Sequence, residues 1–168
     1  GYGGKGVIVI ENSAMHNIKS LLDFYINKSK DESNYVILQD FIEGAEKGDV
    51  RVLVLNGKPI GAIRRVPAKG DVRSNISAGG SVEKYKLTKA DRHLCDKIGK
   101  KLVQDGIYFA GLDIIEGKLI EINVVSPGGI TRINKFNRTK IQSKVIDFVE
   151  NVVSYKEKAI NRKRDHKK

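Results

Sequence analysis

Residues 108–124 constrain the fold of this 168-residue chain more than any other segment. Two apolar, β-branched runs, Tyr108–Ile115 and Leu119–Val124, flank the tripeptide Glu116-Gly117-Lys118. Two such runs separated by a short glycine-containing loop are typical of a β-hairpin. A three-residue loop with Gly117 in a left-handed conformation would pair Ile114 with Ile120, Leu112 with Ile122 and Asp113 with Glu121. The segment therefore predicts a hairpin with one apolar face of even-numbered residues.

The opposite face of the same hairpin gathers side chains that carry oxygen. The predicted register places Asp113 opposite Glu121, with Asn123 next along the strand. Adjacent carboxylates repel unless cations compensate them, and Asp, Glu and Asn oxygens are ligands that suit Mg²⁺. The pattern alone also permits a polar face that meets only water. The following segment, 124–130, is rich in small residues that let the backbone approach a ligand, which favours the metal site.

Other segments predict an α+β arrangement. Asn56-Gly57 is a strong hairpin turn signal between the runs Val50–Leu55 and Pro59–Val66. Thr88 and Asp91 have the spacing of a capping box, and Gly106 has the position of a helix C-terminal cap. The remaining expected elements are helices at 14–29 and 140–156 and a strand at 35–42.

Two glycine-containing segments are expected to be loops. Residues 1–6 are immediately followed by the β-type run Val7–Ile10 and resemble the tip of a hairpin, so we expect native residues upstream of Gly1. Residues 67–81 lack apolar periodicity and predict a long polar loop of the kind that often covers a site.

Charge and composition limit the function. The net charge is +11, of which the residues from Lys156 onward contribute +5, from seven basic and two acidic side chains. We interpret 156–168 as a solvated tail, although the charge leaves open a basic nucleic-acid-binding module. The single cysteine, Cys95, excludes an intrachain disulfide and is interpreted as a packing residue. No apolar run or leader pattern indicates a membrane protein, so a cytoplasmic location is expected.

The motifs GYGGKG, LQDFIEGAEKGDVRVLVLNG, RRVPAKGDVRSNISAGG and GLDIIEGKLIEINVVSP occur in this order. Together they resemble the ATP-grasp ligases, and in particular the bacterial type of glutathione synthetase. The resemblance implies an antiparallel sheet packed with helices, without the family's N-terminal domain and part of its lid subdomain. Residues 1–42 would be the lid remnant, 43–155 the catalytic core with a mobile loop at 67–81, and 156–168 the basic tail.

The resemblance also implies roles for individual residues. Catalytic arginines that meet phosphate or substrate would be Arg51, Arg65 and Arg73. ATP would be bound by Gly1, Gly3, Gly4, Gln39, Asp40, Phe41, Ile42 and Asp49. The peptide and amino-acid substrates would be bound by Asn75, Gly79, Gly80, Ser126 and Pro127. Two Mg²⁺ ions, or Mn²⁺ in their place, would be held by Asp113, Glu121 and Asn123.

A member of this family would phosphorylate a carboxylate with ATP and let an amine attack the acyl phosphate. The expected reaction joins γ-glutamylcysteine to glycine, with no nucleic-acid or membrane partner and with the oligomeric state left open. A related ligase that adds glutamate or another amino acid shares the GDxRSNxxxGG pattern. The spacing from Asn123 to Ser126-Pro127 favours glutathione synthetases, whereas Gly128-Gly129 departs from the residues that usually follow. A non-catalytic fragment that binds nucleotide only in part is a further alternative.

Overall fold

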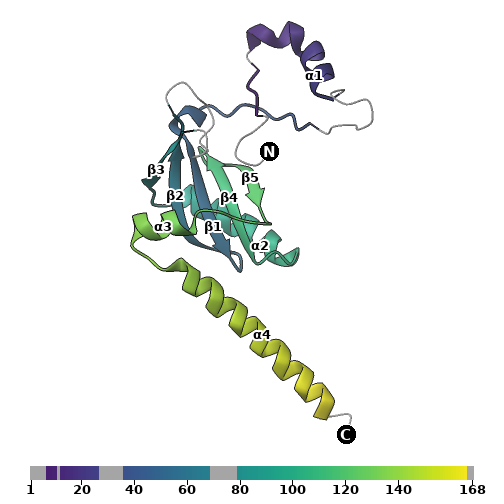
Figure 1. Ribbon diagram of the computed structural model, residues 1–168, viewed down its shortest axis with the longest axis vertical. Helices are drawn as coiled ribbons and strands as arrows, with labels where there is room; N and C mark the ends of the chain where they lie inside the picture. Colours follow the sequence, from purple (N-terminus) through teal and green to yellow (C-terminus); the bar gives the residue numbers. More distant parts are fainter. Residues whose placement is uncertain (1–6, 11, 27–35, 69–78, 166–168) are drawn as a thin grey trace.

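The structure is a computed structural model and describes residues 7–10, 12–26, 36–68 and 79–165. A five-stranded antiparallel sheet forms its centre, with the strand order β3-β2-β1-β4-β5 (Figure 1). The strands are β1 (Asp49–Leu55), β2 (Lys58–Val66), β3 (Ser81–Lys84), β4 (Phe109–Ile115) and β5 (Lys118–Asn123). Helices flank this sheet, so the predicted α+β arrangement is confirmed. The short strand β3 lies at the end of the predicted loop and was not anticipated.

One face of the sheet packs against helix α2 (Lys89–Gln104). The buried cluster between them consists of Val50, Val52, Val54, Ala62, Cys95, Leu102, Ala110, Leu112 and Ile114. Two glycines let the helix approach the first hairpin closely, because a Cβ added at Gly99 would lie 2.1 Å from the carbonyl oxygen of Gly57. Cys95 is fully buried in this cluster, and burial raises the pKa of its thiol to about 11. The interpretation of Cys95 as a packing residue is confirmed.

Both predicted ends of helix α2 are confirmed. The Thr88 hydroxyl accepts a hydrogen bond from the Asp91 backbone N–H, and the Asp91 carboxylate accepts one from the Thr88 backbone N–H. At the other end Gly106 is left-handed, with φ of 78°. The Ile107 N–H donates to the Leu102 carbonyl at 2.8 Å, as in a glycine-terminated helix cap.

The opposite face of the sheet is covered in part by helix α3 (Ile130–Asn137), which the sequence did not predict. Ile133 is fully buried against Leu53, Ile63 and Ile141. Gly61 on β2 provides the space, because a Cβ there would lie 2.5 Å from Ile133 Cγ2. Apolar residues at Ile130, Ile133 and Phe136 have helical spacing, but the eight-residue helix is too short for a strong periodic signal.

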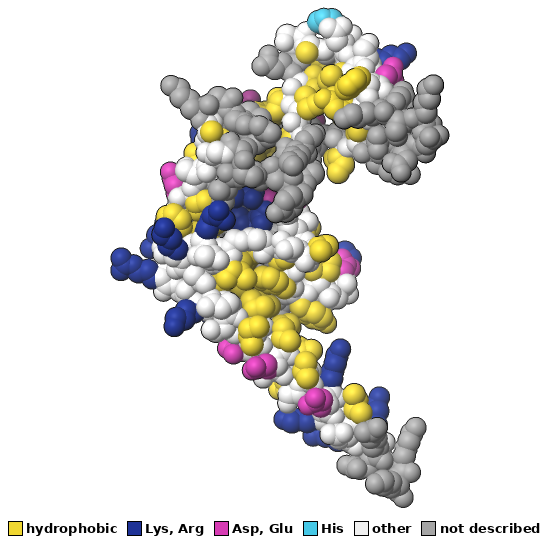
Figure 2. All heavy atoms as spheres, viewed as in Figure 1, with side chains coloured by type: hydrophobic (Ala, Val, Ile, Leu, Met, Phe, Trp, Pro, Cys, Tyr) yellow, Lys and Arg dark blue, Asp and Glu magenta, His cyan; other side chains and the backbone are white. Residues whose placement is uncertain are grey.

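Helix α4 (Ile141–Asp165) runs away from the sheet (Figure 1). The predicted end near Lys156 is wrong, since most of the basic segment continues the helix. Its Lys, Arg and Glu residues are good helix formers. Figure 2 shows hydrophobic side chains along the upper half of α4, where Ile146, Val149 and Val153 are each about half exposed. Phe148 contacts the ring of Tyr108, the residue before β4, at a centroid distance of 5.8 Å.

The register of the β4–β5 hairpin was predicted in part. Asp113 pairs with Glu121 and Leu112 with Ile122, as expected, but Ile114 pairs with Leu119. The turn has two residues, Glu116 and Gly117, both at positive φ. Ile120 is the extra residue of a bulge, and it restores the predicted pairing beyond the turn. The predicted apolar face is only half correct, because Ile122 on the edge strand is 39% exposed.

The N-terminal part of the chain differs most from expectation. The helix predicted at 14–29 appears as a 3-10 helix, η2 (Asn12–Asn17), followed by α1 (Ile18–Ile26), and its last three residues lie outside the described part. The segments 7–10 and 36–42 are not strands. A strand needs a hydrogen-bonded neighbour, and within the described ranges neither segment has one. The 3-10 turn η3 (Ala45–Lys47) then leads into the sheet, and no helix in the described part of the chain could span a membrane.

Candidate functional site

A row of charged side chains crosses the sheet on the face that also carries α3. Arg51 on β1 pairs with Asp113 on β4, which pairs with Glu121 on β5. Two residues before Arg51 on β1, Asp49 pairs with Arg65 on β2. Cross-strand partners share a face, so all five side chains project to the same side. The sheet thus gathers residues that are as far apart in sequence as Asp49 and Glu121.

Four of these charges form a buried network. Arg51 donates to both carboxylate oxygens of Asp113, through Nε to Oδ1 and through Nη2 to Oδ2 at 2.8 Å. Arg65 donates through Nε to Asp49 Oδ1 at 2.7 Å, and its Nη2 lies 2.8 Å from Asp113 Oδ2. Asp113 is 1% exposed, and the other three residues are also buried. Two guanidinium groups and two carboxylates make this network neutral.

The protonation of Arg65 follows from these contacts. Burial lowers the pKa of its guanidinium, since charge is disfavoured away from water. The hydrogen bond to Asp49 and the negative charges of Asp113 and Asp49 outweigh burial and raise the pKa above its ordinary value. Arg65 therefore stays charged at any relevant pH, as a partner for anions must.

Asp113, Glu121 and Asn123 lie together, as the sequence predicted. The Asn123 side-chain amide is 3.4 Å from Asp113 Oδ2, and Glu121 is exposed on the edge strand beside Asp113. Carboxylate and amide oxygens are hard donors of the type that Mg²⁺ prefers, so the donor chemistry fits this ion. Among the described residues no group of three Asp, Glu, His or Cys side chains is already arranged as a complete metal site. Asp113 is committed to two arginines, which the sequence did not reveal.

The turn after β5 approaches the same network. The Gly128 carbonyl accepts a hydrogen bond from Arg51 Nη1 at 3.1 Å. Gly111 on β4 makes room for the turn, because a Cβ there would lie 3.2 Å from Pro127 Cβ and 3.3 Å from Arg51 Cδ. Ser126 is exposed and Pro127 is half-buried, so the predicted substrate residues border the charged row. Gly128 was missed as a partner of Arg51, since a carbonyl contact leaves no mark in a sequence.

Several predicted nucleotide and lid residues lie apart from this network or cannot be placed. Gln39, Asp40 and Phe41 are exposed and Ile42 is half-buried in the extended segment before η3. The Asp49 carboxylate, which the resemblance assigns to ATP binding, accepts hydrogen bonds from Arg65. Gly79 and Gly80 directly precede β3, and Gly79 has φ of 90°. The remaining predicted site residues, Gly1, Gly3, Gly4, Arg73 and Asn75, lie outside the described residues.

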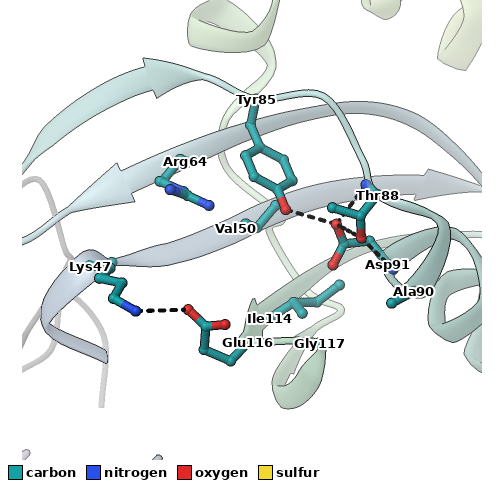
Figure 3. A pocket seen from close by; sticks show the side chains of 11 residues that line it. Lys47, Val50, Arg64, Tyr85, Thr88, Ala90, Asp91, Ile114, Glu116 and Gly117 are labelled. Carbon is teal, nitrogen blue, oxygen red and sulfur yellow. Dashed lines mark hydrogen bonds and ion pairs between the residues drawn. The ribbon is translucent and has the colours of Figure 1, made fainter. Parts of the chain in front are cut away.

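A cavity of about 260 Å³ lies on the other face of the sheet, beside α2 (Figure 3). In this cavity Arg64 stacks on the Tyr85 ring at 4.8 Å, and the Tyr85 hydroxyl donates to Asp91. Lys47 and Glu116 form a loose, exposed ion pair at 3.8 Å. None of the predicted site residues that the structure describes lines this cavity. The charged row therefore remains the candidate site, on the strength of its chemistry.

Comparison with known proteins assigns the fold and the family. A family model described as "Prokaryotic glutathione synthetase, ATP-grasp domain" matches residues 1–138. The fold is thus of the ATP-grasp class, in agreement with the observed antiparallel sheet and its helices. The chain belongs to the prokaryotic glutathione synthetase ATP-grasp family, which confirms the resemblance in the sequence motifs.

Curated relatives named glutathione synthetase agree with this assignment. The chain is 38% identical over 149 residues to the protein of Gloeobacter violaceus and 39% identical over 152 residues to that of Agrobacterium fabrum. Each match covers 89% of this chain, but only 45% and 46% of those two proteins. The chain therefore spans a little under half the length of these relatives.

Solved structures give a weaker likeness. The ATP-grasp ligase PsnB complexed with minimal precursor is 18% identical, with a TM-score of 0.47. The similarity covers 67% of this chain and 36% of that chain.

Proposed function

We propose that this chain is the metal- and phosphate-binding part of an ATP-dependent carboxylate–amine ligase that makes glutathione. The observation that carries the proposal is the row Arg51–Asp113–Glu121, with Arg65 at its buried end and Asn123 beside it. The row combines hard metal ligands with guanidinium groups on one sheet face. The name shared by the curated relatives supports glutathione as the product.

The residues of the row have distinct tasks in this proposal. Asp113, Glu121 and Asn123 would hold Mg²⁺, with Mn²⁺ as the alternative ion. Arg65, whose charge is fixed, would offset the negative charge that accumulates when a phosphate and a carboxylate approach each other. Bound ATP would supply the phosphoryl group that converts the substrate carboxylate into an acyl phosphate, the electrophile that an amine can attack.

Flanking segments would bind and enclose the substrates. Gln39–Ile42 would receive adenine, since the apolar side chains of Phe41 and Ile42 suit a planar ring. Ser126 and Pro127 would border the amino-acid substrate, because the Gly128 contact to Arg51 fixes their turn beside the row. The loop at 67–81, with Arg73 and Asn75, would exclude water from the acyl phosphate. Glycine is the proposed acceptor of γ-glutamylcysteine.

The test is a ligation assay with the full-length enzyme, ATP, Mg²⁺, γ-glutamylcysteine and a panel of amino acids. We expect phosphate release and a product with the mass of glutathione when glycine is supplied. Glu121→Ala should lower kcat/KM by at least about 100-fold, because a charge-stabilising group is lost. Glu83→Ala removes an exposed carboxylate from the other edge strand and should leave activity unchanged.

The outcomes separate the alternatives. A product only with glutamate, or with another amino acid, would assign the chain to a related ligase of the same fold. Phosphate release with no amino acid in the panel would argue against peptide-bond formation. Tight, strongly salt-dependent binding to generic DNA, without turnover of ATP, would favour a nucleic-acid-binding module.

A further inference from the structure

All three guanidinium nitrogens of Arg51 donate hydrogen bonds within the protein. Its Nε and Nη2 groups donate to Asp113, and Nη1 donates to the Gly128 carbonyl at 3.1 Å. Its side chain is 9% exposed and lies along Gly111 and Gly129. Arg51 thus joins the predicted metal ligand on β4 to the turn that follows β5. An arginine that only awaited a substrate anion would not need both of these contacts.

The same contacts leave Asp113 little capacity for a cation. Its Oδ1 accepts from Arg51, and its Oδ2 is shared by Arg51 and Arg65. The buried network of Asp49, Arg51, Arg65 and Asp113 is already neutral. A divalent cation added alone would lie close to two guanidinium groups. Within the row, Glu121 is the one carboxylate left to offset its charge. Away from water this repulsion is strong.

We propose that the Arg51 guanidinium competes with a divalent cation for Asp113, so that the cation binds there only together with an anionic polyphosphate. A phosphate can accept the bidentate hydrogen bonds that the guanidinium now gives to Asp113. The released carboxylate oxygen can then bind the metal, and the added negative charge offsets the cation. The inference rests on the proposed metal and phosphate site, and specifies that the two ligands bind as a pair.

This coupling is a linkage between two ligands, so each must raise the affinity of the other by the same factor. Equilibrium dialysis of the 168-residue chain can measure it, with manganese determined on both sides of the membrane. The probes are Mn²⁺ alone, Mn²⁺ with inorganic tripolyphosphate, and Mn²⁺ with ADP. We expect tripolyphosphate and ADP to tighten retention of Mn²⁺ by the protein at least about tenfold. Complexes of Mn²⁺ with polyphosphate that are not bound to protein distribute equally across the membrane. The excess manganese on the protein side therefore measures protein-bound Mn²⁺.

Arg51→Met is the decisive variant, because it should produce a gain. With one guanidinium removed, Asp113 Oδ1 loses its arginine partner and the network is negative, so retention of Mn²⁺ alone should rise several-fold. The polyphosphate effect should shrink in the same variant. Arg64→Met is the matched control. It removes the same charge from the adjacent strand β2, where Arg64 faces Tyr85 on the other side of the sheet. It should leave both values unchanged.

Circular dichroism checks that the variants fold. If Arg51→Met is unfolded, Arg51→Lys is used, which keeps the charge but lacks the forked donors, and should reduce the coupling. Equal retention of Mn²⁺ with and without polyphosphate would overturn the proposal. So would no retention in any arm, or weaker retention of Mn²⁺ alone by Arg51→Met. The ligase proposal would survive these results, since it requires only turnover by the full-length enzyme.

Discussion

The two hairpins of the sheet, β1–β2 and β4–β5, share one backbone design and carry different chemistry. Each turns through two residues at positive φ, Asn56-Gly57 and Glu116-Gly117. In each, the register shifts after two pairs, so that Leu53 pairs with Gly61 and Asp113 with Glu121 at equivalent positions. A buried leucine in one hairpin thus corresponds to a buried carboxylate in the other.

What covers each hairpin explains the difference. Helix α3 places Ile133 over Gly61, so the first hairpin holds an apolar contact there. The second hairpin ends at the edge strand β5, where Glu121 is exposed, and its Asp113 is sheltered by arginines from the first hairpin. The same backbone therefore supports apolar packing where a helix covers it and a cluster of charged side chains where an edge remains accessible.

Asp113→Ala should produce the largest change in unfolding free energy, because it disrupts the buried charged network at the second hairpin. It leaves two buried guanidinium groups with one carboxylate, and removing one partner of a buried ion pair costs about 3–5 kcal/mol of unfolding free energy. Urea denaturation followed by circular dichroism measures this loss. Glu121→Ala, on the exposed side of the same pair, should change stability by less than about 0.5 kcal/mol. Equal effects for both variants would contradict the buried network.

Gly61→Ala should disrupt the apolar contact between the first hairpin and helix α3. Its Cβ would lie 2.5 Å from Ile133 Cγ2, and overpacking of this kind costs about 1–3 kcal/mol of unfolding free energy. The same denaturation experiment applies, with Gly128→Ala as the control, because a Cβ there meets nothing within 4 Å. In the double variant Gly61→Ala, Ile133→Ala, the strain should disappear. If the losses of unfolding free energy in the two single variants simply add in the double variant, Ile133 does not pack against Gly61.

Asp91→Asn tests the N-terminal cap of helix α2, which covers the sheet face that the two hairpins share. Burial raises the pKa of Asp91, but the hydrogen bonds from Thr88 and Tyr85 outweigh burial and lower it. The native pKa thus lies below the unfolded value, so the stabilisation is present above about pH 4 and is lost as the pH falls further. At pH 7 Asp91→Asn should cost about 1 kcal/mol, and the acid-dependent loss should shrink.

Thermal unfolding between about pH 2 and pH 7 follows both effects. Asp96→Asn is the control, because Asp96 lies on the same helix in an exposed ion pair with Lys58. It should leave the midpoint nearly unchanged at pH 7. An unaltered acid profile in Asp91→Asn would mean that the capping box does not depend on charge.

Glu116→Asn should have the smallest effect and would make the two turns alike. Glu116 has φ of 45°, a left-handed conformation that Asn adopts more easily than Glu. The exposed ion pair with Lys47 contributes little, so we expect a gain of about 0.5 kcal/mol in unfolding free energy. The converse change, Asn56→Glu, should cost a similar amount. Equal stabilities for all three proteins would mean that the turn residue is unimportant here.

Comparison of individual elements shows why some sequence predictions succeeded. The Asn56-Gly57 turn, the Thr88–Asp91 capping box and the cap at Gly106 depend on residues a few positions apart, so local chemistry determines them. The pairing of Asp113 with Glu121 was also predicted, although through the wrong loop length. The bulge at Ile120 compensates for the shorter turn, and its position leaves little trace in the apolar pattern.

Predictions that depended on distant partners fared less well. The segments 7–10 and 36–42 have apolar strand composition, but they lack a paired neighbour within the described residues. Helix α3 was missed because its stability derives from Ile133 in the space above Gly61, a contact between residues 72 positions apart. Short helices of this kind are stabilised by tertiary packing more than by propensity.

By itself, the sequence determined the family motifs, the turns and caps, and the grouping of the oxygen-bearing side chains of Asp113, Glu121 and Asn123. Only the tertiary structure decided that Asp113 is held by Arg51 and Arg65, and that Arg51 also binds the turn at Gly128. The physical reason is the placement of β1 between β2 and β4. That order brings together charges from two separate hairpins in a buried, neutral network, and no local pattern records which strands become neighbours.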